Sequence, residues 1–228
     1  MLDSYYALGT DPIYEIFRDA KYPWEPLARL KDYLKEFFVK NSPTPADKLP
    51  AGCIVKGDVL IEEGAKIEEG TWIHGPAIVK SGAEVRFGAY IRGNVYVCSG
   101  AVVGHDTEVK HAIFLNGAKA GHFAYVGDSI LGAEANLGAG TKLGNVKIDM
   151  GRKNLKIRVN GEPVDTGLRK MGAMIGDGAS LGCNTVTSPG TLIGRRVLGY
   201  PLASLSGVIP PNSIVKYKPA LEIVPRRD

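Results

Sequence analysis

Cysteine is scarce in this sequence, and the features of a targeting segment or a membrane helix are missing. The 228 residues include three cysteines, Cys53, Cys98 and Cys183, without CxxC spacing. This pattern argues against a disulfide framework or a zinc ribbon. The first residues carry acids where a signal peptide needs a basic and then an apolar segment, and no apolar run approaches about 18 residues. We therefore expect a cytoplasmic protein without a membrane span.

The sequence also has little excess charge of either sign. Its formal net charge is +4, and it contains no block of lysines and arginines of the kind that binds a nucleic-acid backbone. With 44% hydrophobic and 23% charged residues, it has the balance of an ordinary globular protein, so we expect one main domain with appendages. The expected ligands are small anions rather than nucleic acid.

A period of six residues dominates the stretch from residue 54 to residue 144. Neither a helix nor an ordinary strand has this period. It is typical of a parallel β-helix, in which each hexad forms one flat side of a coil and three hexads complete the coil. The sequence therefore predicts an all-β, left-handed parallel β-helix built from hexapeptide repeats. The repeated positions are all β-branched, namely Val55, Ile61, Ile67, Ile73, Val79, Val85, Ile91, Val97, Val103 and Val109.

The repeat is interrupted twice in its middle. Two steps of five residues, after Val109 and after Val126, predict corners that are tighter than the others. Further on, the repeat is expected to resume at Ile175 and to end near Ile214. The apolar positions after Val109 are Phe114, Ala120, Val126, Leu131, Leu137 and Leu143, followed by Ile175, Leu181, Ile193 and Leu198.

Three appendages are expected on the β-helix. Residues 11–40 have helical apolar spacing, and Asp11 followed by Pro12 is typical of a helix start. Residues 147–169 contain KIRV, Asn160-Gly161 and EPVD, which predict a β-hairpin with a type I′ turn outside the coils. We therefore divide the chain into a helical extension (1–45), a β-helix (46–215) with an inserted loop (145–170), and a basic tail (216–228). The helices are expected to cap one end of the coils, and trimerisation to hide a face.

Repeat register places charged residues on neighbouring coils. Arg92 follows Ile91 and Lys110 follows Val109, so the two cations are expected one coil apart, at about the 4.8 Å strand spacing. Stacked like charges repel, and a bound phosphate would relieve the repulsion. The alternative is that both side chains extend into water.

The same register brings other polar residues toward one corner. Glu108 and Tyr125 are expected on adjacent coils, with His122 on the side leading into their corner. A histidine, a carboxylate, a phenol and two cations are therefore predicted to converge where the repeat loses a residue. Such a set suits acid–base chemistry on an anionic substrate.

The segment Lys119-Ala-Gly-His-Phe-Ala-Tyr-Val-Gly-Asp128, followed by Asn136-Leu-Gly-Ala-Gly-Thr141, resembles a specific family signature. It is similar to the acetyltransferase (C-terminal) domain of the bifunctional UDP-N-acetylglucosamine pyrophosphorylase/glucosamine-1-phosphate N-acetyltransferase. The resemblance runs from about Ala89 to Asn145 and resumes more weakly from Lys170 to Pro219.

The resemblance implies a role for each matching residue. His122 is implied as the general base, with Glu108 orienting its imidazole and Asn145 near the reacting centre, supplied across a subunit boundary. The implied donor is acetyl-CoA, no metal is predicted, and the shared site implies a homotrimer. The implied sugar-phosphate contacts are Arg92, Lys110, Tyr125, Asn136 and Lys170, and the implied coenzyme A contacts are Ala139, Cys183 and Lys218.

The sequence departs from the family pattern in places that concern specificity. Val146 stands where the family has a sugar-contacting tyrosine, Cys183 replaces a serine, and the 147–169 hairpin is an insertion beside the site. His105 and His111 raise the alternative of a zinc-dependent carbonic anhydrase of this fold, but their spacing does not reproduce that family's ligands.

We therefore predict an acetyl-CoA-dependent N-acetyltransferase that acts on an amino-sugar phosphate such as glucosamine 1-phosphate, in nucleotide-sugar or cell-envelope precursor synthesis. One alternative is an acyltransferase with another donor or acceptor. The other is a non-catalytic β-helix module that partners a separate sugar nucleotidyltransferase, because residues 1–45 lack that enzyme's glycine-rich signature.

Overall fold

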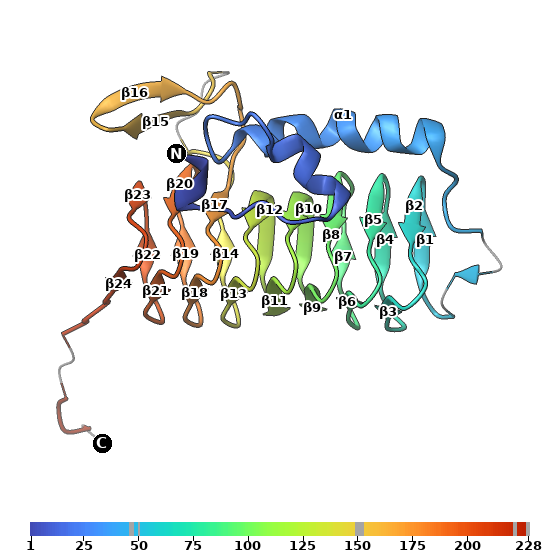
Figure 1. Cartoon of the computed structure of the whole chain (residues 1–228). Helices are drawn as coiled ribbons and strands as arrows, with labels where there is room; N and C mark the ends of the chain where they lie inside the picture. The colour runs from blue at the N-terminus through green and yellow to red at the C-terminus, as the bar shows by residue number, and fades with distance from the viewer. Residues whose placement is uncertain (46–47, 50, 149–152, 221–222, 227–228) are drawn as a thin grey trace.

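The main body of the protein is a parallel β-helix whose coils follow one another along a single axis (Figure 1). A computed structural model describes residues 1–45, 48–49, 51–148, 153–220 and 223–226. The predicted fold class, a left-handed hexapeptide-repeat β-helix with a helical extension and an inserted hairpin, is confirmed. None of the helices among these residues is long and apolar enough to cross a membrane.

Each coil has three sides, and the strands of each side pair with those of the next coil in parallel. We call the three resulting surfaces face 1, face 2 and face 3, in chain order. Face 1 consists of β1 (Ile54–Lys56), β4 (Trp72–His74), β7 (Tyr90–Ile91), the first parts of β10 (Glu108–Phe114) and β12 (Tyr125–Leu131), β14 (Lys142–Leu143), β19 (Val186–Thr187) and β22 (Ser204–Leu205).

The other two faces continue from the ends of these strands. Face 2 consists of β2 (Val59–Ile61), β5 (Ala77–Val79), β8 (Val95–Val97), the second parts of β10 and β12, β17 (Ala173–Ile175), β20 (Thr191–Ile193) and β23 (Val208–Ile209). Face 3 consists of β3 (Lys66–Ile67), β6 (Glu84–Val85), β9 (Val102–His105), β11 (Lys119–His122), β13 (Asn136–Leu137), β18 (Ser180–Leu181), β21 (Leu198–Gly199) and β24 (Ile214–Val215).

The interior of the coils is filled by the residues of the six-residue period. The predicted positions from Ile73 to Leu143 are fully or almost fully buried in one continuous cluster, together with alanines such as Ala101 and Ala118. Val55, Ile61 and Ile67, in the first coil, are partly buried against that cluster. The repeat register predicted for this stretch is confirmed.

Near the C-terminal end, the predicted interior position Leu198 is wrong by one residue, and the apolar residue near which the repeat was predicted to end, Ile214, also lies one residue away from the interior position. Leu198 and Ile214 point outward, with 48% and 56% of their surfaces exposed. Their neighbours Gly199 and Val215 take the inward positions of β21 and β24. Gly199 has no side chain, so an apolar period could not reveal its inward position.

The two tightened corners lie inside single strands. β10 and β12 each bend from face 1 into face 2 without a loop, and the bends are at His111 and Asp128. Both residues adopt left-handed backbone angles, with φ of 47°. One such residue turns the chain where the other corners use a longer turn, which explains the five-residue steps.

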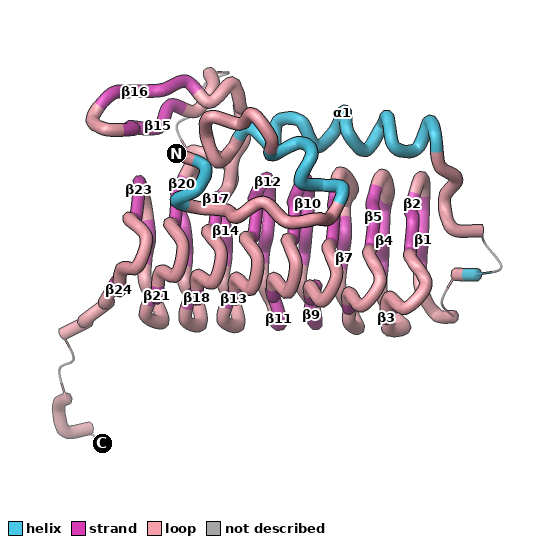
Figure 2. Tube along the Cα trace, in the orientation of Figure 1, coloured by secondary structure: helices cyan, strands magenta, loops and turns pink. Residues whose placement is uncertain are grey.

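The N-terminal extension covers face 2 and does not cap an end, so that prediction is wrong. It contains two 3₁₀ helices, η1 (Leu2–Ser4) and η2 (Pro12–Phe17), and the α-helix α1 (Glu25–Lys40), which runs along the coils (Figures 1 and 2). Its buried side chains pack on the outward-facing apolar residues of face 2. The extension contributes Tyr6, Ile13, Phe17, Trp24, Leu27, Leu30 and Leu34, and face 2 contributes Ile78, Tyr96, Ile113, Ile130, Met174 and Leu192.

A helix begins at the predicted Asp11–Pro12 start, as η2, but η1 precedes it and the residues between η2 and α1 are not in one continuous helix. The Asp11 carboxylate accepts a hydrogen bond from the Ile13 N–H at 2.9 Å, and Pro12 occupies the first turn. The same carboxylate accepts from the Tyr96 hydroxyl on face 2 at 2.8 Å. The cap of η2 therefore also fixes the extension to the coils.

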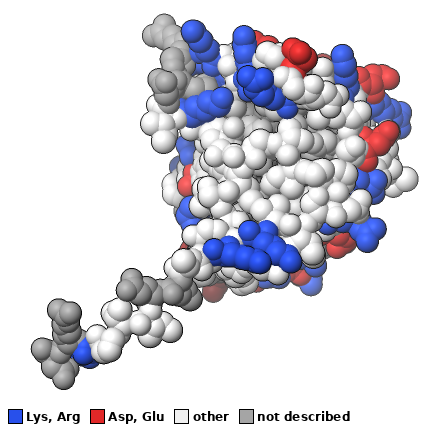
Figure 3. Space-filling model, turned by 90° about the vertical axis from the view of Figure 1, so that its left-hand side faces the viewer, with Lys and Arg blue, Asp and Glu red and all other residues white. Residues whose placement is uncertain are grey.

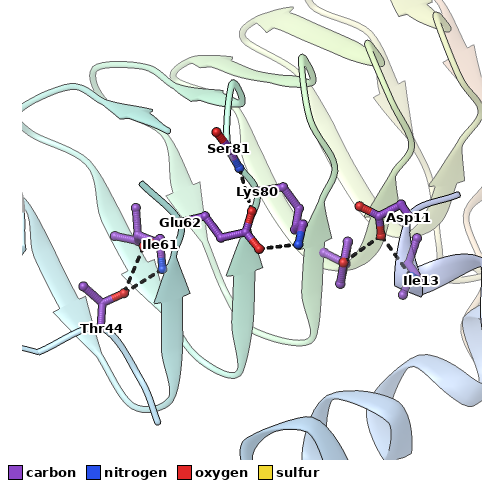
Figure 4. A network of polar contacts seen from close by, with 8 residues as sticks. Asp11, Ile13, Thr44, Ile61, Glu62, Lys80 and Ser81 are labelled. Carbon is purple, nitrogen blue, oxygen red and sulfur yellow. Dashed lines mark hydrogen bonds and ion pairs between the residues drawn. The ribbon is translucent and has the colours of Figure 1, made fainter. Parts of the chain in front are cut away.

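Polar contacts hold both ends of the extension to the β-helix. At the start, the Asp177 carboxylate accepts from the Ala7 N–H at 2.7 Å and from the Ala133 N–H at 2.8 Å. After α1, the Thr44 hydroxyl accepts from the Ile61 N–H at 2.8 Å (Figure 4). The extension is thus bound to coils near both ends of the stack.

The predicted hairpin is confirmed as β15 (Lys156–Val159) and β16 (Glu162–Asp165), an antiparallel pair. Asn160 and Gly161 join them with φ of 51° and 88°, as a type I′ turn requires. Residues 149–152 of the insertion lie outside the described residues. Leu155 and Ile157 are buried in the same cluster as the N-terminal extension, so the hairpin completes the cover of face 2.

The domain limits proposed from the sequence stay a prediction, but the elements can be compared with them. α1 ends at Lys40, the chain leaves the coils after Leu143, and it returns at Ala173. The last strand ends at Val215, beyond which the tail extends away from the coils (Figure 1). Seen from this end, the surface is largely uncharged, with Lys and Arg gathered near its upper and lower margins (Figure 3).

Candidate active site

An ion pair on face 1 joins two of the predicted site residues. Arg92 Nη1 lies 2.5 Å from Glu108 Oε1 across adjacent coils, and both side chains are more than a third exposed. This hydrogen bond is the main cause that raises the pKa of Arg92. The guanidinium also lies over the Tyr90 ring, 5.9 Å from its centre. Glu108 and the Tyr90 ring therefore hold the exposed Arg92 guanidinium, with its planar set of N–H donors, in one place.

The structure corrects two expectations about this pair. Ile91 pairs with Val109, so Arg92 and Lys110 do lie on neighbouring coils, but Glu108 already balances the Arg92 charge. The predicted repulsion between Arg92 and Lys110 as two unpaired cations is therefore wrong. Glu108 was also expected to orient His122, yet among the described residues its side chain bonds Arg92 and not the imidazole.

Tyr125 and Asn145 lie together at the far end of face 1. Tyr125 follows Glu108 on the next coil, as predicted. A Cβ placed on Gly127 would lie 2.6 Å from the Tyr125 hydroxyl and 2.8 Å from Asn145 Nδ2, so only glycine leaves room for both groups. Burial, followed by the Glu108 and Asp128 charges, raises the pKa of Tyr125. The phenol is therefore a neutral donor at physiological pH.

The two predicted lysines lie near the same end of face 1. Lys110 is half-buried, and its Cα pairs with that of Gly127. Lys170 is exposed and precedes Met171, whose N–H donates to the Asn145 carbonyl at 3.1 Å. We call Arg92, Glu108, Lys110, Tyr125, Asn145 and Lys170 the face 1 group.

A groove on face 3 collects other predicted residues. Its volume is about 550 Å³, and His122, Asn136 and Ala139 line it. His122 is exposed at the end of β11, and a Cβ on Gly121 beside it would meet no atom within 4 Å. The groove floor is therefore open next to the imidazole, because residue 121 has no side chain.

Coil stacking places Cys183 near this groove. Asn184 donates its N–H to the Ala139 carbonyl at 2.8 Å, so Cys183 lies one coil beyond Ala139, and it is exposed. Lys218 is exposed in the tail after β24, where the described residues give it no partner. We call His122, Asn136, Ala139 and Cys183 the face 3 group.

The two groups are carried by different faces of one chain, and the corner at which His122 lies is not one of the tightened corners, which corrects that part of the predicted convergence. The tightened corners join face 1 to face 2, whereas His122 lies at the corner between face 3 and face 1. Tyr125 begins face 1, and its hydroxyl reaches toward the opposite end of that face, beside Asn145. The phenol hydroxyl therefore points along face 1, away from the corner at which His122 lies.

The histidines near His122 have partners of other kinds. His105 pairs with His122 on the preceding coil, as predicted, and its Nδ1 donates to the Phe87 carbonyl at 2.9 Å. The Phe87 ring stacks on it, with ring centres 5.6 Å apart. Among the described residues, no group of three His, Cys, Asp or Glu side chains is placed to hold a metal ion.

Sequence reasoning missed Asp128, although it closes the quoted signature. Its carboxylate is buried and accepts a hydrogen bond from Asn145 Nδ2. It also missed Arg86, which lines the groove and bonds Glu84 at 2.9 Å. A buried acid at a five-residue step was the available signal for Asp128, since a charge there needs a partner.

Fold and side chains together define a class of protein, the hexapeptide-repeat β-helices with a histidine at a coil corner. Residues 73–167 match the family described as GMPPB C-terminal domain. The chain is 42% identical over 212 residues to "Bifunctional protein GlmU" of Methanococcus maripaludis, a match that covers 93% of this chain and 50% of that protein.

A second relative is the "Bifunctional sugar-1-phosphate nucleotidylyltransferase/acetyltransferase" of Sulfurisphaera tokodaii. It is 41% identical over 147 residues, which cover 64% of this chain and 36% of the relative. The predicted resemblance is confirmed: the chain is homologous to the C-terminal region of such bifunctional proteins. It spans half or less of the length of these two relatives.

The chain is also similar to a solved structure. AntD, an N-acyltransferase from Bacillus cereus in complex with dTDP and 3-hydroxybutyryl-CoA, is 14% identical and covers 76% of this chain and 84% of its own. The TM-score of the two structures is 0.29.

Proposed function

We propose that the protein is an acetyl-CoA-dependent N-acetyltransferase that acts on an amino-sugar phosphate such as glucosamine 1-phosphate. The observation that carries the proposal is the exposed His122 in a groove with Asn136 and Ala139, within a chain homologous to bifunctional nucleotidyltransferase/acetyltransferases. We also propose that a separate sugar nucleotidyltransferase partners this chain, because the name of one relative includes nucleotidylyl transfer.

The proposed chemistry is a direct acyl transfer. The substrate amine attacks the thioester carbonyl, the new N–C bond forms, and the C–S bond breaks to release the coenzyme A thiolate. His122 accepts the proton that the amine loses and returns it to the thiolate, so the imidazole ends the cycle neutral. No covalent enzyme intermediate is required.

The two groups of side chains have complementary roles in this proposal. Within the face 1 group, Arg92 and Lys110 would hold the phosphate, because a guanidinium binds phosphate oxygens in a fixed fork, and Asn145 would lie near the reacting centre of a neighbouring copy. The face 3 group would hold the coenzyme and the reacting amine. Ala139 and Cys183 lie on successive coils, which suits an extended pantetheine chain.

Because the groups lie on different faces, we propose that a complete site forms between copies of the chain. In a cyclic homotrimer, face 1 of one copy would meet face 3 of its neighbour, and the same contact repeated three times closes the ring. Exposed apolar side chains on both faces support this arrangement, with Trp72 and Tyr90 on face 1 and Leu198 on face 3.

The test is a steady-state assay of thiol release from acetyl-CoA with glucosamine 1-phosphate. We expect His122→Ala to lower kcat by about a hundredfold or more, in line with the loss of a general base. His105→Ala, one coil away and with no place in the proposed chemistry, is the matched control and should keep most of the activity. Undiminished turnover by His122→Ala would show that the base has been assigned wrongly.

Coenzyme A binding separates this proposal from a non-catalytic module. Calorimetric titration of the wild-type protein should detect coenzyme A binding at millimolar ligand. If neither binding nor thiol release occurs with any amino-sugar phosphate, the β-helix is a structural or regulatory partner and the proposed enzyme activity is wrong.

A further inference from the structure

His111, Asp128 and Asn145 lie at the same position on successive coils, at the corner between face 1 and face 2. Lys110 pairs with Gly127 and Ala112 with Ser129, so His111 lies opposite Asp128 on the next coil. The Asp128 carbonyl then accepts the Gly172 N–H at 2.7 Å. Asp128 therefore lies where the inserted loop, which begins beside Asn145, returns to the coils.

The Asp128 carboxylate holds the Asn145 amide in one orientation. Both side chains are buried, with 6% and 9% of their surfaces exposed, and Asn145 Nδ2 donates to Asp128 Oδ2. An ionised carboxylate only accepts hydrogen bonds, so the amide nitrogen and not the amide oxygen must face it. Hydrogen-bonding chemistry alone thus excludes the flipped amide.

His111 lies opposite Asp128 on the neighbouring coil but does not neutralise the charge of its carboxylate. Burial lowers the pKa of His111, with Lys110 and Lys31 acting in the same direction, and Asp128 and the Leu27 carbonyl in the opposite one. The imidazole is therefore neutral at physiological pH and does not form an ion pair with Asp128. A charged acceptor makes the stronger bond to the Asn145 N–H.

The amide so oriented lies beside the phenol of the face 1 group. Val126 and Gly127 separate Tyr125 from Asp128 in sequence, and both the Tyr125 hydroxyl and Asn145 Nδ2 border the space above Gly127. Asp128 itself is withdrawn from solvent, so it reaches the proposed substrate only through Asn145.

We propose that Asp128 is a positioning residue that fixes the Asn145 amide for acyl transfer and ties its place to the root of the inserted loop. This proposal rests on the proposed function, because it assigns Asp128 a part in that site. Residue 128 has φ of 47°, a conformation that glycine and asparagine tolerate as well as aspartate. Substitutions can therefore remove or keep the acceptor without straining the backbone.

The first experiment is a double-mutant cycle in the thiol-release assay. We expect Asp128→Gly to lower kcat by about tenfold with a smaller change in the KM for the sugar phosphate, because the amide loses a charged acceptor. Asp128→Asn should restore most of kcat, since its amide oxygen still accepts from Asn145. In the Asn145→Ala background, Asp128→Gly should have no further effect.

Glu134→Gly is the matched control, because Glu134 lies on the same coil with φ of 56° but is exposed. It should leave kcat unchanged. If the role of Asp128 is purely structural, Asp128→Gly will lower the melting temperature but leave kcat and KM of the folded enzyme unchanged, and the proposal is overturned. Independent effects of Asp128→Gly and Asn145→Ala on kcat would also overturn it.

A second pair of variants tests the contact without an activity readout and covers the case in which Asp128→Gly does not fold. Asn145→Asp places two carboxylates in contact and should lower the melting temperature, and adding Asp128→Asn should restore it. Absence of this rescue overturns the contact. If the wild-type protein has no activity, the proposed function fails and the positioning role fails with it, whereas an active wild type without coupling overturns only the positioning role.

Discussion

Face 2 and face 1 are built from the same repeat, yet their outward surfaces are opposite in character. The outward residues of face 2, such as Ile78 and Ile113, are completely or almost completely buried under the chain's own N-terminal extension and hairpin. On face 1, Ile54, Trp72 and Tyr90 are 46%, 41% and 40% exposed. The inward positions of a hexad specify the coil, whereas the outward positions specify what covers it.

A charge placed among the exposed apolar residues of face 1 should have the largest effect, which we expect on the assembly of the protein. If face 1 meets a second copy, Trp72→Glu should convert the trimer to monomers, because it places a charge at the centre of an apolar contact. Sedimentation velocity would measure the change. Val39→Glu, on the outer side of α1, adds the same charge at another exposed apolar site and should leave the assembly intact. A Trp72→Glu protein that sediments like the wild type would place the interface elsewhere.

Breaking the cover of face 2 should destabilise the fold itself. Leu30 is fully buried in α1, so Leu30→Ala should lower the free energy of unfolding by about 2–5 kcal/mol through lost burial and a cavity. Val39→Ala on the same helix, where the side chain is 79% exposed, should change it by less than about 0.5 kcal/mol. Urea denaturation at one protein concentration measures both, and equal effects would contradict a cover that packs on the coils.

The half-buried His111 should make the smallest contribution, visible in the pH dependence of stability. Because burial lowers the pKa of His111 in the folded protein, the unfolded chain binds more protons below the ordinary histidine pKa. The free energy of unfolding should therefore fall as the pH drops from about 7.5 to about 5. His111→Gln should lessen this fall, whereas His74→Gln, on exposed face 1, should not. An unchanged slope in His111→Gln would refute the effect.

Most of the fold was predictable because a β-helix repeats one local rule. A β-branched residue recurs every six positions and points into the interior each time, so Val79 and Val103 could be assigned to the interior without any long-range information. The rule failed at Gly199, whose inward position carries no side chain to reveal it. It was also silent about the outside of the coils, where the extension selects face 2 through packing between segments far apart in sequence.

The candidate site was predictable in its members but not in its grouping. Register correctly placed Glu108 beside Tyr125 and His105 beside His122. It could not show which way side chains reach, so it missed the Arg92–Glu108 pair and the direction of the Tyr125 hydroxyl toward Asn145. Whether the two groups act together depends on a second copy of the chain, which a repeat pattern does not describe.

The contacts of the first few residues set an order of events during synthesis. Ala7 bonds Asp177, 170 positions later, and the Tyr5 and Ser4 carbonyls accept N–H groups of Asp177 and Arg195. Coils can form one after another as the ribosome delivers them, but the amino terminus can dock only when nearly the last coil exists. The N-terminal extension is thus fixed in place only after most of the coils that follow it in the chain, and until then the outward apolar residues of face 2 lack their cover.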